Sequence, residues 1–179
     1  MTVLPILKYP HPFLRQCVED FEFPEDISSE NIPMKALSHL NATLADLWET
    51  LYDCPGAIGL AAPQVALPMR LFILDLTAKT TRSEQKVIIN PVILQQSKQK
   101  MVREGCLSFP DYLANIKRSL KLTLAYRNEH GQPVEEEFRD LGAIAVQHEI
   151  DHLNGVLLID QVACLKSDWI RRRGLPPIS

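Results

Sequence analysis

A histidine-bearing helix constrains the fold of this chain more than any other feature. The run His148-Glu149-Ile150-Asp151-His152 falls inside an apolar stretch, residues 143–153, which Asn154-Gly155 should end. Residues four apart share one face of a helix, so the two imidazoles can bind one metal ion while Glu149 handles a proton. Buried imidazoles and carboxylates require partners, so the domain must be built around this helix. The alternative is a structural helix with two histidines by chance.

The remaining pattern predicts an α+β domain in which antiparallel strands pack around this central metal-binding helix. A proline-rich arm of about thirty residues should wrap around the domain. We expect a long N-terminal helix from residue 31, strands at 70–76, 86–94, 120–126 and 133–139, and a short C-terminal helix at 165–173. Residues 1–179 should form a single catalytic domain.

Composition and charge limit the ligands and the cellular locations that we expect for the chain. The net charge is −3 and no long Lys/Arg run is present, which argues against nucleic acid as the main ligand. No apolar run approaches the roughly 20 residues that a membrane-spanning helix needs. The opening residues lack the pattern of a secretory signal, so we expect a cytoplasmic protein. The four cysteines are far apart, and no disulfide framework is expected.

Two histidines leave a catalytic tetrahedral site one protein ligand short. In longer forms of the helical motif, a third histidine follows the glycine by three residues. The corresponding position here is Leu158, so this third ligand is absent. Downstream, Asp160 and Asp168 are alternatives. The preferred candidate is upstream, in Glu104-Gly105-Cys106-Leu107-Ser108, where a thiolate can reach a metal and a backbone N–H can point at a substrate oxygen. Taken alone, a cysteine such as Cys106 is more often an inert buried residue than a metal ligand.

A third segment, residues 57–65, joins the long helix to the first strand. Its small residues let the backbone approach a ligand closely, and Gln64 offers an uncharged donor for a developing oxyanion. Taken alone, the segment is better explained as a Gly/Ala-rich connection with a surface glutamine.

Together the three segments resemble the peptide deformylase family, whose signatures end in Ala-Ala-x-Gln, Glu-Gly-Cys-Leu-Ser and Gln-His-Glu-x-Asp-His-Leu. In this chain they are residues 59–64, 104–108 and 147–153, in the same order. The opening residues 4–15 also look like the family's N-terminal arm, so the resemblance covers nearly the whole chain.

The resemblance implies an enzyme that removes the formyl group from N-formylmethionyl peptides, the nascent chains, and releases formate. Cys106, His148 and His152 would hold one divalent metal, natively Fe(II), with zinc, nickel or cobalt as substitutes. Glu149 would serve as general base and then as acid. The Gln64 amide and the Leu107 backbone N–H would meet the oxyanion.

Substrate contacts and supporting residues are predicted at the edges of this site. Ile58, Gly59, Leu60 and Ile144 are candidate walls of the methionine pocket. Glu104 and Arg118 are candidates for a pair that holds the cysteine loop in place and supports the ligands, and two unrelated surface charges fit the sequence equally well.

Two residues depart from the family pattern, and two alternative functions remain. Ala57 replaces a glycine usual in the family, and Asp111 follows Pro110 where many members have glycine, so the substrate cleft should differ. A zinc endopeptidase with a downstream acid as third ligand is one rival, and a silent relative that binds blocked N-termini is the other. The arginine cluster 171–173 is a candidate for transient contact with the ribosome, although such a cluster is more often a solvated helix end.

Overall fold

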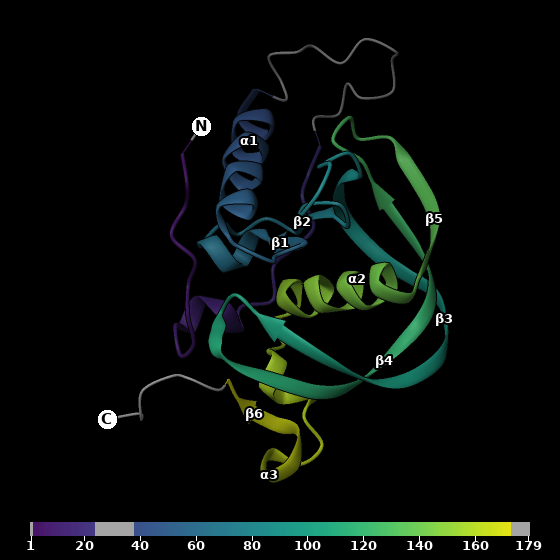
Figure 1. Cartoon of the computed structure of the whole chain (residues 1–179). Coiled ribbons are helices and arrows are strands. Elements are labelled where there is room, and N and C mark those ends of the chain that lie inside the picture. The colour runs from purple at the N-terminus through teal and green to yellow at the C-terminus, as the bar shows by residue number, and fades with distance from the viewer. Residues whose placement is uncertain (1, 24–37, 173–179) are drawn as a thin grey trace.

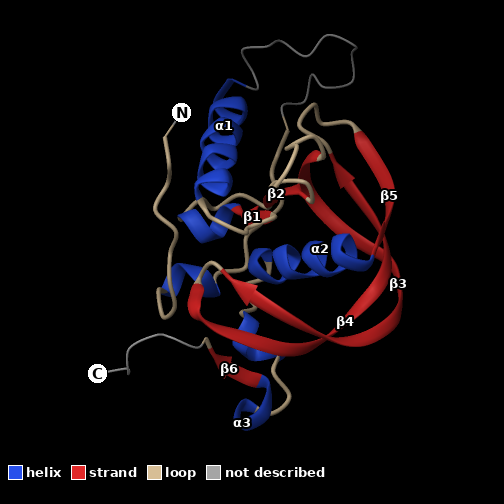
Figure 2. Ribbon diagram, viewed as in Figure 1, coloured by secondary structure: helices blue, strands red, loops and turns tan. Residues whose placement is uncertain are grey.

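The computed structural model describes residues 2–23 and 38–172, which form one antiparallel sheet and three α-helices (Figures 1 and 2). The strands follow the order β1-β2-β3-β4-β5, and β6 pairs with β4. The elements are β1 (Gly59–Ala61), β2 (Leu71–Asp75), β3 (Gln85–Cys106), β4 (Phe109–Arg127), β5 (Pro133–Arg139), β6 (Trp169–Arg171), α1 (Ser38–Asp53), α2 (Asp140–Leu153) and α3 (Leu165–Asp168). The mixed class with an antiparallel sheet is confirmed. In the described ranges, no helix is long and apolar enough to cross a membrane.

Strand β2 is buried on both faces because a helix covers each of them. Leu71 and Ile73 pack in the cluster that contains the leucines of α1, whereas Phe72 and Leu74 pack in the cluster that contains α2. This alternation follows from the pleat, which sends successive side chains to opposite faces. Residues 31–37 of the predicted N-terminal helix lie outside the described residues. The two clusters fix α1 and α2 against opposite sides of one short strand (Figure 1).

Strands β3 and β4 form a hairpin far longer than the predicted strands at 86–94 and 120–126. Pairing continues through polar positions such as Gln99 with Ser119 and reaches Cys106 with Phe109, leaving a two-residue turn at Leu107 and Ser108. The side chains of residues 94–101 are largely exposed, so no alternating apolar signal marks this part of the strand. The hairpin curves around α2 (Figure 1). The end of β3 brings Cys106 to within 3.2 Å of His152 on that helix.

The C-terminal helix is shorter than expected over residues 165–173. Helix α3 ends at Asp168, and Trp169–Arg171 forms β6 on the edge of β4. Trp169 stacks on Tyr112 with ring centroids 4.8 Å apart, and it meets Phe109 edge to face. These aromatic contacts come from a strand distant in sequence and outweigh the local helical pattern.

The end of α2 is held against the N-terminal arm by a close backbone approach at Gly155. The arm's Val18 N–H donates to the Leu153 carbonyl at 3.0 Å, and Cys17 forms a bridge with Asn154. Gly155 has φ +68°, and a Cβ atom placed on it would lie 2.4 Å from the Arg15 carbonyl oxygen. Only glycine satisfies both the conformation and the space.

Gly155→Ala is therefore expected to destabilise the fold by about 2 kcal/mol and lower the melting temperature by about 5 °C. Gly56→Ala is the matched control, because Gly56 also has a positive φ of +89° but faces only the end of the Lys79 side chain at 3.7 Å. Thermal unfolding measured by circular dichroism should show a clearly larger loss for the Gly155 variant. Equal losses in the two variants would show that the contact with Arg15 contributes nothing.

Candidate active site

Helix α2 turns His148, Glu149 and His152 away from the apolar cluster that fixes its rotation. Ala143, Val146 and other apolar residues of the helix pack into the core against the sheet. The rings of His148 and His152 meet edge to face with centroids 5.1 Å apart, as their spacing of four predicts. Both imidazoles lie on the same side of the helix, facing the turn of the long hairpin.

Cys106 reaches these imidazoles from the end of β3. Its Sγ lies 3.2 Å from His152 Nε2, and the Ser108 N–H donates to the sulfur at 3.4 Å. One ligand atom from each of Cys106, His148 and His152 lies within 4.8 Å of the other two. A thiolate with two imidazoles is a donor set that iron and zinc both accept, so the residues fit a divalent ion.

The downstream acids proposed as rival ligands do not join this group in the described part of the chain. Asp160 forms an ion pair with Arg15 and accepts from the Leu157 N–H at 2.8 Å. Its carboxylate is committed to the link between the N-terminal arm and the segment after α2. The geometry therefore favours Cys106 as the third ligand.

The charges of the group favour a thiolate opposite imidazoles. Burial alone raises the pKa of Cys106, but the nearby charges of His152 and His148 outweigh it, and the pKa falls well below its ordinary value. Burial likewise opposes protonation of His148, yet Cys106 and Glu104 raise its pKa well above the usual value. The thiolate form that binds metals is thus the favoured form of Cys106.

A buried ion network supports His148 from behind. Glu104 Oε2 lies 2.8 Å from His148 Nδ1, which leaves Nε2 facing Cys106 and the pocket. Arg118 donates to both oxygens of Glu104, at 2.9 and 3.2 Å, and to Asp151 at 2.7 Å. Arg118 is only 5% exposed. The structure therefore brings the predicted pair Glu104 and Arg118 together, and it adds Asp151, which the sequence did not single out for this place.

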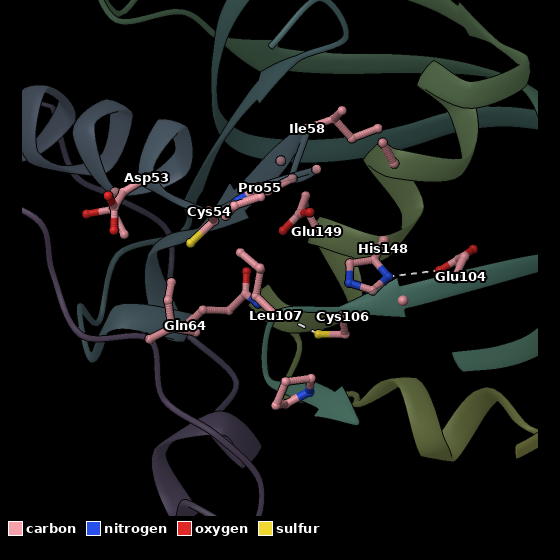
Figure 3. A pocket seen from close by; sticks show the side chains of 18 of the residues that line it. Asp53, Cys54, Pro55, Ile58, Gln64, Glu104, Cys106, Leu107, His148 and Glu149 are labelled. Carbon is pink, nitrogen blue, oxygen red and sulfur yellow. Dashed lines mark hydrogen bonds and ion pairs between the residues drawn. The ribbon is translucent and has the colours of Figure 1, made fainter. Parts of the chain in front are cut away.

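Glu149 stands beside the group as a buried acid with one free oxygen. It is 4% exposed, and in the described structure its Oε2 has no hydrogen-bond partner. Burial raises the pKa of Glu149, although the charges of His148 and His152 oppose the shift. A Cβ atom on Gly59 would lie 2.6 Å from Glu149 Oε1, so the absent side chain of Gly59 makes room for the carboxylate. Figure 3 shows Glu149, His148 and Cys106 gathered along the same wall of the pocket.

The amide of Gln64 is oriented by its neighbours. Its Oε1 accepts from the Ala61 N–H at 3.0 Å, so Nε2 is left as donor, 3.3 Å from Ser108 Oγ and 3.8 Å from Cys106 Sγ. The residue is 2% exposed, in the short 3-10 helix η3 (Ala62–Val65) that follows β1. An N–H donor is thereby held next to the candidate metal ligands.

The group opens into a cavity of about 980 Å³. Its lining includes Leu107 and three of the four predicted wall residues, Ile58, Gly59 and Ile144. The assignment of Leu60 to the pocket wall is wrong, because its side chain is fully buried and packs in the cluster with α1. The reason is the pleat of β1, which points Leu60 to the face opposite Gly59.

Other lining residues were not predicted. They include Val3, Leu4, Ile6 and Lys8 of the N-terminal arm, together with Arg103 and Arg172. The arm is placed by hydrogen bonds from the Leu7 N–H to the Gln64 carbonyl, at 2.7 Å, and from the Tyr9 N–H to the Ser108 carbonyl, at 3.0 Å. In the sequence, only the expectation that the N-terminal arm wraps around the domain could have indicated the contacts of the arm.

A buried thiolate and two imidazoles beside an acid, inside a pocket of ligand size, are the arrangement of a metal-dependent hydrolase. A sequence profile of the polypeptide deformylase family matches residues 3–168. A peptide deformylase of Rhizobium meliloti is 40% identical over 175 residues, covering 97% of this chain and 92% of that protein. The crystal structure of a peptide deformylase from Legionella pneumophila has a TM-score of 0.78 at 33% identity, covering 92% and 89% of the two chains. That from Thermotoga maritima has a TM-score of 0.77 at 33% identity, covering 92% and 100%.

The chain belongs to the peptide deformylase family. It is an enzyme, and its reaction is the metal-dependent removal of the formyl group from nascent peptides. The resemblance inferred from three short motifs is confirmed over nearly the whole chain. The group of Cys106, His148 and His152 is a possible metal site for this reaction.

Proposed function

We propose that Cys106, His148 and His152 hold one divalent ion, natively Fe(II), and that deformylation takes place beside it. Their convergence beside the pocket, which Cys106 and His148 line, is the observation that carries the proposal. Zinc, nickel and cobalt are the expected substitutes, because thiolate and imidazole donors accept all of them. When bound, such an ion acts as a Lewis acid toward a carbonyl oxygen and lowers the pKa of water.

Glu149 is proposed as the group that moves the proton. Its free Oε2 is buried next to the ligands, where it takes a proton from the attacking water and then gives it to the departing amine. The C–N bond of the formamide breaks, and the products are formate and a free N-terminal amine. One carboxylate thus serves both halves of the reaction.

The negative charge on the former carbonyl oxygen is met by the Gln64 side chain and the Leu107 backbone N–H. The contact between Gln64 Oε1 and the Ala61 N–H fixes Nε2 as the donor that faces the pocket. Leu107 lies in the two-residue turn next to Cys106, so its backbone borders the same space. Donors that are oriented before the reaction do not need to reorganise as the charge develops.

Glu104 and Arg118 are proposed as positioning residues that orient His148. Glu104→Gln is expected to weaken metal affinity by about 10–100-fold, because the amide no longer holds Nδ1 of His148 as a carboxylate does. Competition with a chelator measures this affinity. Glu137→Gln is the matched control, since Glu137 pairs with Lys121 on the exposed face of β5. An unchanged affinity in the Glu104 variant would rule out the role.

The substrate side of the pocket is assigned to the apolar walls. Ile58 and Ile144 line the cavity and offer a surface for the methionine side chain, and Gly59 lets the carboxylate stand close to the formyl carbon. The proposed place of action is the cytoplasm, where nascent chains emerge, with transient contact to the ribosome. The whole chain is proposed to act as one catalytic domain.

Formate release tests the proposed reaction at this site. Protein purified without oxygen and loaded with Fe(II) should release formate from formyl-Met-Ala-Ser and leave acetyl-Met-Ala-Ser intact. A metal-loaded protein that binds the formylated peptide without releasing formate would favour the silent-relative alternative. Cleavage of internal peptide bonds would favour the endopeptidase alternative.

A further inference from the structure

The mouth of the pocket is positively charged although the chain as a whole carries a net charge of −3. The exposed charged residues that line it are Lys8, Lys79, Arg103, Arg172 and Asp53. The mouth thus carries four cations and one carboxylate. We call the four cations, Lys8, Lys79, Arg103 and Arg172, the rim. The more deeply placed Glu104 is buried and paired with Arg118.

The rim cations come from separate parts of the chain and have no carboxylate partner among the described residues. Arg103 donates to the Asn115 side chain at 3.1 Å, a neutral contact that leaves its charge uncompensated. The charge of Lys8 acts on Cys54, which lines the same pocket. Lys79 Nζ lies 3.8 Å from the position that a Cβ atom on Gly56 would take. Positive charge thus surrounds the space in front of the candidate metal ligands.

Arg172 lies against the residue that precedes the candidate ligand Cys106. Its backbone N–H donates to the Asp111 carbonyl at 2.8 Å, directly after β6 has paired with β4. One nitrogen of its guanidinium lies 2.6 Å from the position that a Cβ atom on Gly105 would take. Gly105 immediately precedes Cys106, so the absence of a side chain lets the guanidinium rest at the edge of the site. The strand β6, which replaces the expected helix, is what brings Arg172 here.

We propose that the rim makes this enzyme prefer nascent chains that carry acidic residues shortly after formylmethionine. This inference rests on the proposed site, because the formyl group must lie beside Cys106 for the following residues to pass the rim. An extended peptide advances about 3.3 Å per residue, so its third and fourth residues fall near the mouth of a pocket of this size. Their carboxylates would find unpaired cations there, and cationic clefts also speed the arrival of acidic ligands.

The rim's position favours a peptide over ribosomal RNA as its ligand. All four side chains line the cavity that holds Cys106 and Glu149, and they approach it from the arm, the loop after β2, β3 and the segment after β6. A ligand that contacts all of them must therefore enter the cavity. Exposed charge pairs contribute about 0.2–1 kcal/mol each, which corresponds to a preference of about fivefold when two of them act together.

Two isosteric substrates test the proposal with the full-length, metal-loaded enzyme. We expect kcat/KM for formyl-Met-Ala-Glu-Glu-amide to exceed that for formyl-Met-Ala-Gln-Gln-amide by about fivefold at low salt, and the ratio to fall as salt is added. The double variant Arg172→Gln, Lys8→Gln should bring the ratio to about one. Lys100→Gln is the control for a change of net charge, because Lys100 is exposed on β3 away from the pocket and should leave the ratio at about five.

Binding of the deformylated products, Met-Ala-Glu-Glu-amide and Met-Ala-Gln-Gln-amide, gives a readout that does not depend on turnover. The acidic product should bind more tightly by about the same factor, and the double variant should remove the difference. If neither formylated peptide releases formate while this difference in binding holds, the proposed catalytic roles fail and the rim assignment stands.

Equal kcat/KM values for the two substrates in the wild-type enzyme would overturn the inference. It would also be overturned if the double variant kept the acidic preference. A double variant that keeps the preference but no longer sediments with ribosomes would assign the rim to RNA instead.

Discussion

Glu149→Gln is expected to lower kcat/KM for formyl-Met-Ala-Ser by about 10²–10⁴-fold while the metal content stays unchanged. Glutamine has nearly the same shape as glutamate and still fits next to Gly59, where a Cβ atom would lie 2.6 Å from the carboxylate. It cannot accept the proton of the attacking water at neutral pH. The loss should therefore appear in kcat, with metal analysis showing a loaded protein.

Glu137→Gln serves as the control for this substitution, since it makes the same chemical change in an exposed ion pair of β5. Its kcat should equal that of the wild type. A Glu149 variant with at least a tenth of wild-type turnover would mean that another group moves the proton. The acids nearest to the site would then have to be tested in turn, beginning with Glu104.

Cys106→Ala is expected to abolish both metal retention and deformylation, with a loss of activity on the order of 10³-fold or more. Without the Cys106 thiolate, the ion keeps only two neutral imidazole ligands and loses its one negatively charged ligand. Metal analysis after gel filtration and formate release measure the two effects on the same sample. Cys164→Ala is the control, because Cys164 is an exposed free cysteine that does not line the pocket.

The same variant separates the deformylase from an endopeptidase with an acidic third ligand. In that alternative, Cys106→Ala would keep its metal through Asp160. The structure commits Asp160 to Arg15 and to the Leu157 N–H, so retention of metal is not expected. A metal-loaded Cys106→Ala protein would contradict the assigned ligand set.

The parts of the site that lie on one helix were predictable from sequence because their geometry is local. His148, Glu149 and His152 needed only the period of the α-helix. Cys106 could not be joined to them by any local rule, since the long β3–β4 hairpin brings it next to His152, which lies 46 positions further along the chain. Family motifs supplied the missing long-range information.

The errors arose where tertiary contacts decide the local structure. Leu60 was assigned to the pocket because β1 was not expected as a strand, and the pleat of that strand sends its side chain to the opposite face. Residues 169–171 follow a helical pattern in sequence but pair with β4, where Trp169 stacks on Tyr112. Neither outcome can be read from residues adjacent in the chain.

X-ray absorption at the iron edge of the Fe(II)-loaded enzyme tests the proposed ligand set of Cys106, His148 and His152. We expect one ion per chain, one sulfur neighbour, two imidazole nitrogens and lighter atoms at the remaining position, with the sulfur signal gone in Cys106→Ser. An ion surrounded only by nitrogen and oxygen in the wild-type enzyme would contradict this ligand set.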